Sequence, residues 1–262
     1  MIASVWGHRD LIAQLSRREI IGRYRGSVFG LAWSLLYPLV MLGVYVFVFG
    51  VVFGARWGNA PADHAEFGIR VFAGMVIHGL FAENIARAPM LVLHNPQYVK
   101  KVVFPLEILP VVAMLTALFH ALVSLVILAA AHLAKTGELH VAALWLPVVW
   151  APFVLLTLGA SWFLSALSVF LRDVAQLVPI VVTILLFLSP VFYPMDAIPA
   201  IVRPLMYLNP LTFPIEQTRT VLLDGGAPDG PGLAWYVAVA VTILVVGYAF
   251  FRKSRRAFAD VI

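Results

Sequence analysis

The sequence predicts an all-α integral membrane protein, and three observations support that prediction. Hydrophobic residues make up 62% of the 262 residues and charged residues only 12%, which is too apolar for an ordinary soluble domain. Uncharged runs recur along the whole chain, several of them longer than the roughly 20 residues that a helix needs to cross a bilayer. The segments between these runs are too short to bury a separate core. We therefore expect a single transmembrane domain over residues 1–262.

The first segment, residues 1–25, is predicted to form a cytoplasmic amphipathic helix. Its apolar positions share one half of a helical wheel: Leu11, Ile12, Leu15 and Ile20. Arg17 and Arg18 lie on the other half, and Glu19 interrupts the apolar arc. Such a helix would lie in the membrane interface with its arginines towards lipid phosphates. An exposed helix of no special function is the alternative.

Six spans are expected, at residues 26–55, 68–93, 108–131, 141–171, 174–193 and 233–251. The second span is the least apolar, and its Glu83 and Arg87 are four residues apart, so they are predicted to pair along one helix face. His120 in the third span shares a polar stripe with Thr116 and Ser124, and hydrogen bonding between helices is its expected role. Proton handling by Glu83 and His120 is the alternative.

Aromatic residues recur at every fourth position in the first span. Trp33, Tyr37 and Tyr45 lie at depths where lipid-facing positions are more often Leu, Ile or Val, because Trp and Tyr prefer the membrane interface. Aromatic faces stack on the C–H faces of sugars, so this row is a candidate substrate path. Packing against neighbouring helices is the alternative explanation.

A short basic loop, residues 94–104, separates the second and third spans. Pro96 fixes φ and biases the preceding residue towards an extended conformation, which stiffens the loop. Lys100 and Lys101 must lie outside the hydrocarbon core. A stiff, charged loop is suited to receive force from another protein, and a plain connection is the alternative.

Residues 194–231 are rich in proline yet apolar in between. This composition predicts short broken helices that re-enter the membrane from the extracytoplasmic side, where protein or water must satisfy the free backbone groups. An ordinary extracytoplasmic loop is the alternative. When both termini are placed in the cytoplasm, most Lys and Arg residues also fall there, as the positive-inside rule requires.

The sequence holds no motif of a self-contained catalyst. It has no G-x-x-x-x-G-K-[ST] for nucleotide phosphates, no HExxH and no nucleophile elbow. It has no cysteine, and its seven histidines lack metal-ligand spacing. The basic residues sit at the ends of apolar runs, which favours anionic lipid headgroups over nucleic acid as partners. A conduit or a scaffold is therefore expected rather than an enzyme.

Five motifs span nearly the whole chain: RREIIGRYRGSVFGLAWSLLYPL (17–39), NPQYVKKVVFPLEILP (95–110), FLRDVAQLVPIVVTILLFLSPVFYP (170–194), LNPLTFPIEQTR (208–219) and the closing FRKSRRAFADVI. In this order they resemble the permease subunit of type 2 ABC exporters, in the branch that exports O-antigen, capsule and teichoic acid chains. The resemblance implies ATP-driven export of a lipid-linked polysaccharide, with O-antigen as the leading candidate. Capsular polysaccharide, teichoic acid, a drug or a small lipid are alternative substrates. A proton-coupled transporter and a membrane scaffold are alternative classes.

The resemblance also implies an assembly. A homodimer of six-span subunits would lie in the bacterial cytoplasmic membrane with both termini in the cytoplasm. Two copies of a separate ATPase subunit would bind ATP and Mg²⁺, so this chain would need no cofactor or metal of its own.

Site residues follow from the same resemblance. Trp33, Tyr37 and Tyr45 would line the glycan path. The N-terminal helix and the 94–104 loop, acting as a coupling helix, would contact the ATPase through Arg17, Arg18, Gln97, Tyr98, Lys100 and Lys101. The re-entrant mouth on the extracytoplasmic side would be formed by Tyr193, Asn209, Glu216 and Arg219.

Overall fold

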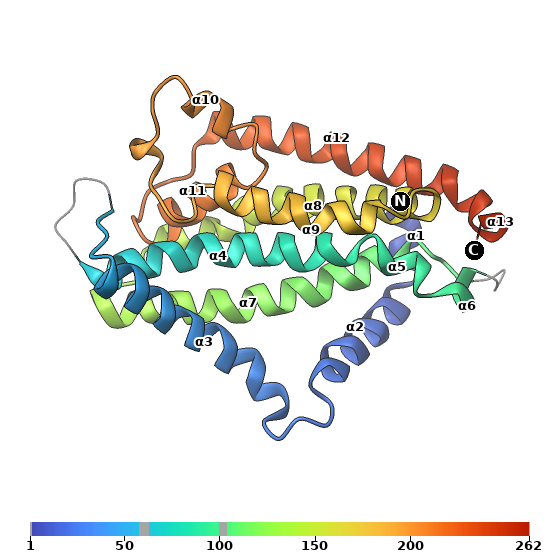
Figure 1. Cartoon of the computed structure of the whole chain (residues 1–262), viewed down its shortest axis with the longest axis horizontal. Coiled ribbons are helices and arrows are strands. Elements are labelled where there is room, and N and C mark those ends of the chain that lie inside the picture. The colour runs from blue at the N-terminus through green and yellow to red at the C-terminus, as the bar shows by residue number, and fades with distance from the viewer. Residues whose placement is uncertain (1, 58–62, 100–103, 262) are drawn as a thin grey trace.

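The computed structural model describes residues 2–57, 63–99 and 104–261, and every regular element within them is a helix. The long helices run along one axis as a bundle, and α2 and α3 form a V that diverges from one side of it (Figure 1). Five segments in the described part of the chain are long and apolar enough to cross a membrane: Gly30–Val52, His64–Arg87, Ile108–Thr136, Val141–Phe170 and Gly230–Ala257. The predicted all-α membrane fold is therefore confirmed.

The first half of the chain contains the following helices: α1 (Ile2–Gly7), α2 (Arg9–Tyr24), η1 (Gly30–Ala32), α3 (Trp33–Tyr45), the π-helical η2 (Val46–Val52), α4 (His64–Arg87), α5 (Met90–Leu93), α6 (Pro96–Val99) and α7 (Ile108–Thr136). The second half contains η3 (Val141–Trp145), α8 (Leu146–Phe170), α9 (Val174–Leu188), η4 (Met195–Ala197), α10 (Arg203–Met206), α11 (Thr212–Leu222), α12 (Gly230–Ser254), η5 (Arg255–Ala257) and α13 (Phe258–Val261).

The boundaries of the long helices follow from local chemistry. Asp63 caps α4, since its carboxylate accepts a hydrogen bond from the backbone N–H of Glu66 at 3.0 Å. Gly137 ends α7 in the left-handed conformation, with φ of 78°, which glycine adopts without steric cost. Leu171 and Ser189 end α8 and α9 with extended backbone.

The expected fifth span is shorter than its prediction. The sequence remains apolar to Tyr193, but α9 ends at Leu188 and has 15 residues. At 1.5 Å per residue it covers about 22 Å, which is less than the ~30 Å hydrocarbon core. The residues that follow it up to α11 form short helices joined by turns.

The two ends of the bundle differ in what they carry (Figure 1). Both chain termini, α5 and α6 lie at one end, which we call the terminal end. The turn after α7 and the segment from η4 to α11 lie at the opposite end. Helices α5 and α6 are thus separated from the segment between η4 and α11 by the length of the bundle.

An apolar cluster at the terminal end joins elements that are distant in sequence. It includes Ile12 of α2, Val92 of α5, Trp162 of α8, Phe251 of α12 and Phe258 of α13, all buried. Helices α2, α5 and α13 therefore share one core, with Tyr98, Val99 and Phe104 packed against it. A displacement of α2 therefore has to disturb the packing of α5 and α13, and the reverse.

Helices α8 and α12 approach one another closely at two facing glycines. A Cβ added to Gly247 would lie 2.0 Å from the carbonyl oxygen of Gly159, and one added to Gly159 would lie 2.6 Å from the Cα of Leu244. Neither position has room for a side chain. Small residues at such a crossing allow the dispersion contacts that hold helices together in a membrane.

Gly247→Ala is therefore expected to destabilise the purified protein by about 1–3 kcal/mol, since the backbones of α8 and α12 must separate. Gly43→Ala on α3 is the matched control, because a Cβ there meets nothing within 4 Å. Thermal unfolding in detergent should show a lower melting temperature for Gly247→Ala only. Equal melting temperatures for the two variants would contradict the close crossing.

Candidate functional site

A cavity of about 480 Å³, which we call the α3 cleft, lies between α3 and the pair α4 and α7. Its lining comes from the end of α2 (Arg23, Tyr24), from α3 (Trp33, Ser34, Tyr37, Pro38, Met41, Tyr45), from α4 (Phe72, Met75, Val76, Gly79, Leu80, Glu83) and from α7 (Ala117, His120, Ala121, Ser124). All three aromatic residues that the sequence singled out as a substrate path thus line one cavity.

These three aromatic residues differ in exposure. Tyr37 is 67% exposed and Trp33 is 43% exposed, so their ring faces are available to a ligand. Tyr45 is only 8% exposed, with its ring centroid 6.4 Å from that of Phe72. Packing between helices therefore explains Tyr45, whereas it does not explain Trp33 or Tyr37.

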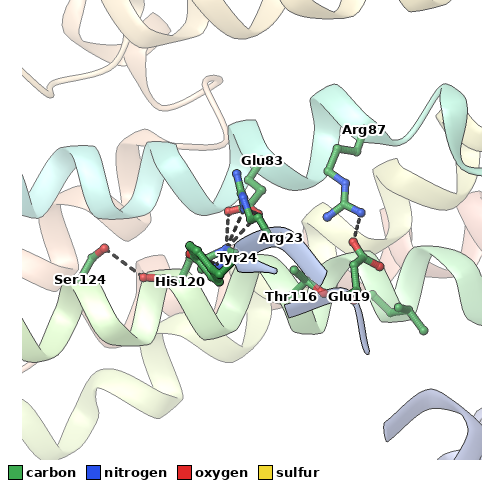
Figure 2. Close-up of polar contacts among 9 residues, drawn as sticks. Glu19, Arg23, Tyr24, Glu83, Arg87, Thr116, His120 and Ser124 are labelled. Carbon is green, nitrogen blue, oxygen red and sulfur yellow. Dashed lines mark hydrogen bonds and ion pairs between the residues drawn. The ribbon is translucent and has the colours of Figure 1, made fainter. Parts of the chain in front are cut away.

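One end of the α3 cleft is polar (Figure 2). The Nδ1 atom of His120 lies 2.9 Å from Glu83 Oε1, and its Nε2 atom lies 3.1 Å from the Tyr24 hydroxyl. Arg23 forms an ion pair with Glu83. Burial raises the pKa of the Tyr24 hydroxyl above its ordinary value. The expected hydrogen bonding of His120 between helices is confirmed, since His120 joins α7 to both α2 and α4.

A second contact holds α2 one turn earlier. Glu19 forms an ion pair with Arg87 of α4, which explains why a carboxylate interrupts the apolar arc of the N-terminal helix (Figure 2). The predicted pair between Glu83 and Arg87 is wrong, because each residue pairs with α2 instead. Helix α2 packs against α7, and its Arg23 and Glu19 side chains reach α4 to pair with Glu83 and Arg87. Spacing along α4 does not reveal this arrangement.

A second cavity of about 470 Å³ is lined by Glu19, Gly22, Arg23, Arg87 and Thr116. Arg23 lines this cavity and the α3 cleft, so its side chain stands between the two. Sequence reasoning did not select Arg23 or Tyr24 as site residues. The available signal was their position at the end of an amphipathic helix, directly before the first span.

The described residues among those expected to contact an ATPase lie on α2 and α6. Arg17 and Arg18 are exposed on α2, on the face opposite the buried Ile12. Gln97 is exposed on α6. Tyr98 stacks on Phe104, with ring centroids 4.1 Å apart and planes 8° from parallel, at the edge of the apolar cluster. Lys100 and Lys101 lie outside the described residues.

Arg219, an expected mouth residue, is 3% exposed and anchors the segment after α9. Its guanidinium donates hydrogen bonds to the carbonyls of Pro190 at 2.6 Å, Val191 at 2.9 Å and Arg70 at 3.0 Å. It also pairs with Glu216 at 2.8 Å. Arg219 thus supplies donors to two carbonyls just after the end of α9 and to one carbonyl of α4.

The other expected mouth residues also make structural contacts at the opposite end. Tyr193 donates a hydrogen bond to the Phe187 carbonyl at 2.9 Å, and Asn209 donates one to the Ser189 hydroxyl at 2.9 Å. Both bonds hold the segment after α9 against the last turn of that helix. None of the four residues lines the α3 cleft.

The site combines exposed aromatic faces with a mixed set of hydrogen-bond donors and acceptors, and such a cavity suits a polar ligand with apolar faces. Within the described residues, no group of three or more His, Cys, Asp or Glu side chains is arranged to hold a metal ion. A bundle of apolar helices with an amphipathic helix at one end and a polar, aromatic cleft inside is the architecture of a membrane transport subunit.

The chain belongs to the ABC-2 type transporter family, whose model matches residues 10–223. It is 27% identical to the O-antigen export system permease protein RfbA of Myxococcus xanthus, over 100% of this chain and 99% of that relative. Two proteins of the same name from Klebsiella pneumoniae are 24% and 23% identical, each over 97% of this chain and 95% of the relative. The family match includes α2, both walls of the α3 cleft and α11.

Arg87→Glu is expected to lower the melting temperature, because it leaves Glu19 facing a like charge. Combining it with Glu19→Arg reverses the pair and should restore about 1 kcal/mol of stability relative to the sum of the single changes. Arg18→Glu is the control, since Arg18 is exposed and the change in net charge is the same. Additive effects of Glu19→Arg and Arg87→Glu would contradict the contact between α2 and α4.

Proposed function

We propose that this chain is the transmembrane subunit of an ATP-driven exporter that moves a lipid-linked polysaccharide, with O-antigen as the first candidate, across the bacterial cytoplasmic membrane. The single observation that carries the proposal is the α3 cleft, where exposed Trp33 and Tyr37 stand beside a polar end formed by Glu83 and His120. The names of the three relatives support the substrate class.

Sugar chemistry fits the lining of the α3 cleft. The C–H faces of a pyranose ring can stack on Trp33 or Tyr37, while its hydroxyls both donate and accept hydrogen bonds. Glu83 accepts such bonds, and Arg23 and Tyr24 donate them. A stacking surface tolerates many sugars, which suits the passage of a chain whose units differ along its length.

The proposed topology has six spans with both termini in the cytoplasm. The common location of the termini at one end of the bundle supports it (Figure 1). Helix α9 serves as a short fifth span, and a bilayer accommodates such a span by local thinning. The helices η4, α10 and α11 then form the re-entrant region on the extracytoplasmic side, held by Arg219.

The proposed assembly is a homodimer with two copies of a separate ATPase subunit, which would bind the ATP and Mg²⁺ that this chain has no motif to hold. Arg17 and Arg18 are exposed on α2 and Gln97 is exposed on α6, and that subunit would dock on these two helices. A second copy of the chain would close the open side of the α3 cleft into a passage.

The proposed coupling runs through α2. Movement of the ATPase displaces α2, and the contacts of Arg23 and Glu19 with α4 must then break. Because Arg23 stands between the two cavities, its displacement joins them into one path along α4 and α7. Export then depends on a reversible set of ion pairs rather than on a rigid wall.

A proton-coupled transporter is the second candidate, because Glu83 and His120 contact each other in the lining of a cavity. The two candidates differ in their energy source. Vesicles that contain the chain and its ATPase should export with ATP alone under the first candidate and require a pH gradient under the second. A drug or a small lipid is the alternative substrate of the ATP-driven exporter. Export of such a substrate would not require Trp33 and Tyr37 as stacking surfaces.

Trp33→Ala combined with Tyr37→Ala is expected to reduce polysaccharide export by about tenfold, because two stacking surfaces are lost. Stimulation of ATP hydrolysis by the partner subunit should persist, since neither residue lies at the terminal end. Phe47→Ala is the control, because Phe47 is 59% exposed on the same span but does not line the α3 cleft. The measurement is surface polysaccharide in cells with matched amounts of each variant. Undiminished export by the double variant would exclude this path.

Arg17→Glu combined with Arg18→Glu should abolish co-purification of the ATPase, while insertion into the membrane remains normal. Reversal of two exposed charges repels a complementary acidic surface without disturbing the buried face of α2. Arg56→Glu, an exposed charge reversal at the other end of the first span, is the control. Normal co-purification and export in the double variant would count against this docking surface.

A further inference from the structure

The end of α12 carries a basic face that the transport path does not use. Arg252, Lys253 and Arg256 are exposed and occupy adjacent turns. They line a groove of about 520 Å³ together with Val245, Tyr248 and Ala249. Cations appear at one end of this groove and apolar side chains at the other.

The three cations lack a counter-ion within the described residues. The ion pairs at this end of the bundle are made by basic residues other than these three, and the neighbouring Arg255 is one of them. Arg255 pairs with Glu107 at 2.8 Å and donates to the Phe104 carbonyl at 3.0 Å. Like charges at helical spacing repel one another, so the group of three gains free energy from an external anion.

The rest of α12 indicates where that anion comes from. Val241, Val245 and Val246 are 43–57% exposed and precede the basic turn, so this face of the helix is apolar along the membrane and basic at its end. Tyr248 lies at the transition, with its ring edge-on to Trp162 at 5.1 Å. Tyrosine prefers the boundary between acyl chains and headgroups, and basic residues prefer the headgroup level.

We propose that the groove formed by Val245, Tyr248, Ala249, Arg252, Lys253 and Arg256 binds an anionic phospholipid from the surrounding bilayer. The phosphate lies against Arg252 and Arg256, with Lys253 and the Tyr248 hydroxyl within the same groove. One acyl chain runs along Val245 and Ala249. Each basic residue adds to the attraction between the protein and an anionic headgroup. The apolar contact with the acyl chain distinguishes a lipid from a free phosphate.

The bound lipid lies beside the core of the coupling region. Tyr248 packs at the edge of the apolar cluster that contains Ile12 of α2 and Val92 of α5. A lipid at this position therefore stabilises the end of the bundle where force from the ATPase is received. The inference does not depend on the polysaccharide path, because the groove and the α3 cleft share no lining residue.

Native mass spectrometry of the purified full-length chain in mixed phosphatidylglycerol and phosphatidylcholine tests the proposal. The unaltered chain should retain phosphatidylglycerol preferentially. Arg252→Gln combined with Arg256→Gln should reduce that preference by about tenfold or more, whereas Arg252→Lys combined with Arg256→Lys should keep it. Arg56→Gln, at the opposite end of the first span, is the control for loss of an exposed cation.

Two outcomes would overturn the proposal. One is unchanged retention of phosphatidylglycerol by the glutamine variant. If that variant also co-purifies less ATPase, the basic surface binds a protein partner instead of a lipid. The other is displacement of the lipid by inorganic phosphate at equal concentration, which would mean that the acyl contact adds nothing. Equal melting temperatures for all variants in detergent without added phosphatidylglycerol ensure that lipid loss is not a consequence of unfolding.

Discussion

An ionisable side chain inside a membrane domain has to meet an opposite charge or a hydrogen-bond partner, and this constraint determines how the N-terminal helix is held. Glu83 and Arg87 of α4 and His120 of α7 would each be costly next to lipid. Helix α2 supplies Arg23, Glu19 and Tyr24 to them. The same contacts bring α2 against α7 and form the polar end of the α3 cleft. Removing these contacts would release α2 and leave charges without partners. The position of α2 and the shape of the α3 cleft therefore depend on the same contacts.

The two ends of the bundle are held together by different interactions. At the terminal end, α2, α5, α8, α12 and α13 share one apolar cluster, so a push on the N-terminal helix reaches the helices around it. At the opposite end, Arg219 fixes the backbone after α9 through carbonyls of both that segment and α4. The arginine is buried, and its donors satisfy groups that a continuous helix would satisfy itself.

Much of this fold follows from the sequence, because long uncharged runs fix the spans and their order. The aromatic row Trp33, Tyr37 and Tyr45 does line one cavity, since residues four apart stay on nearly one face of a helix. The length of α9 was not predictable from hydropathy, because the sequence remains apolar past Leu188, where the helix ends. The partners of Glu83 and Arg87 were not predictable either, because they lie 60 and 68 residues away in the chain. The role of Arg219 likewise depends on carbonyls brought to it by tertiary packing, which no local pattern records.

The central claim is that polysaccharide passes through the α3 cleft, and photocrosslinking during export tests it most directly. A photoreactive amino acid placed at Tyr37 in the cleft, at Phe47 on the same span or at Phe187 on α9 would report which surface the glycan contacts. The account predicts glycan adducts at position 37 that require the ATPase and ATP, and none at positions 47 and 187. Adducts confined to position 47 or 187, with none at position 37, would contradict it.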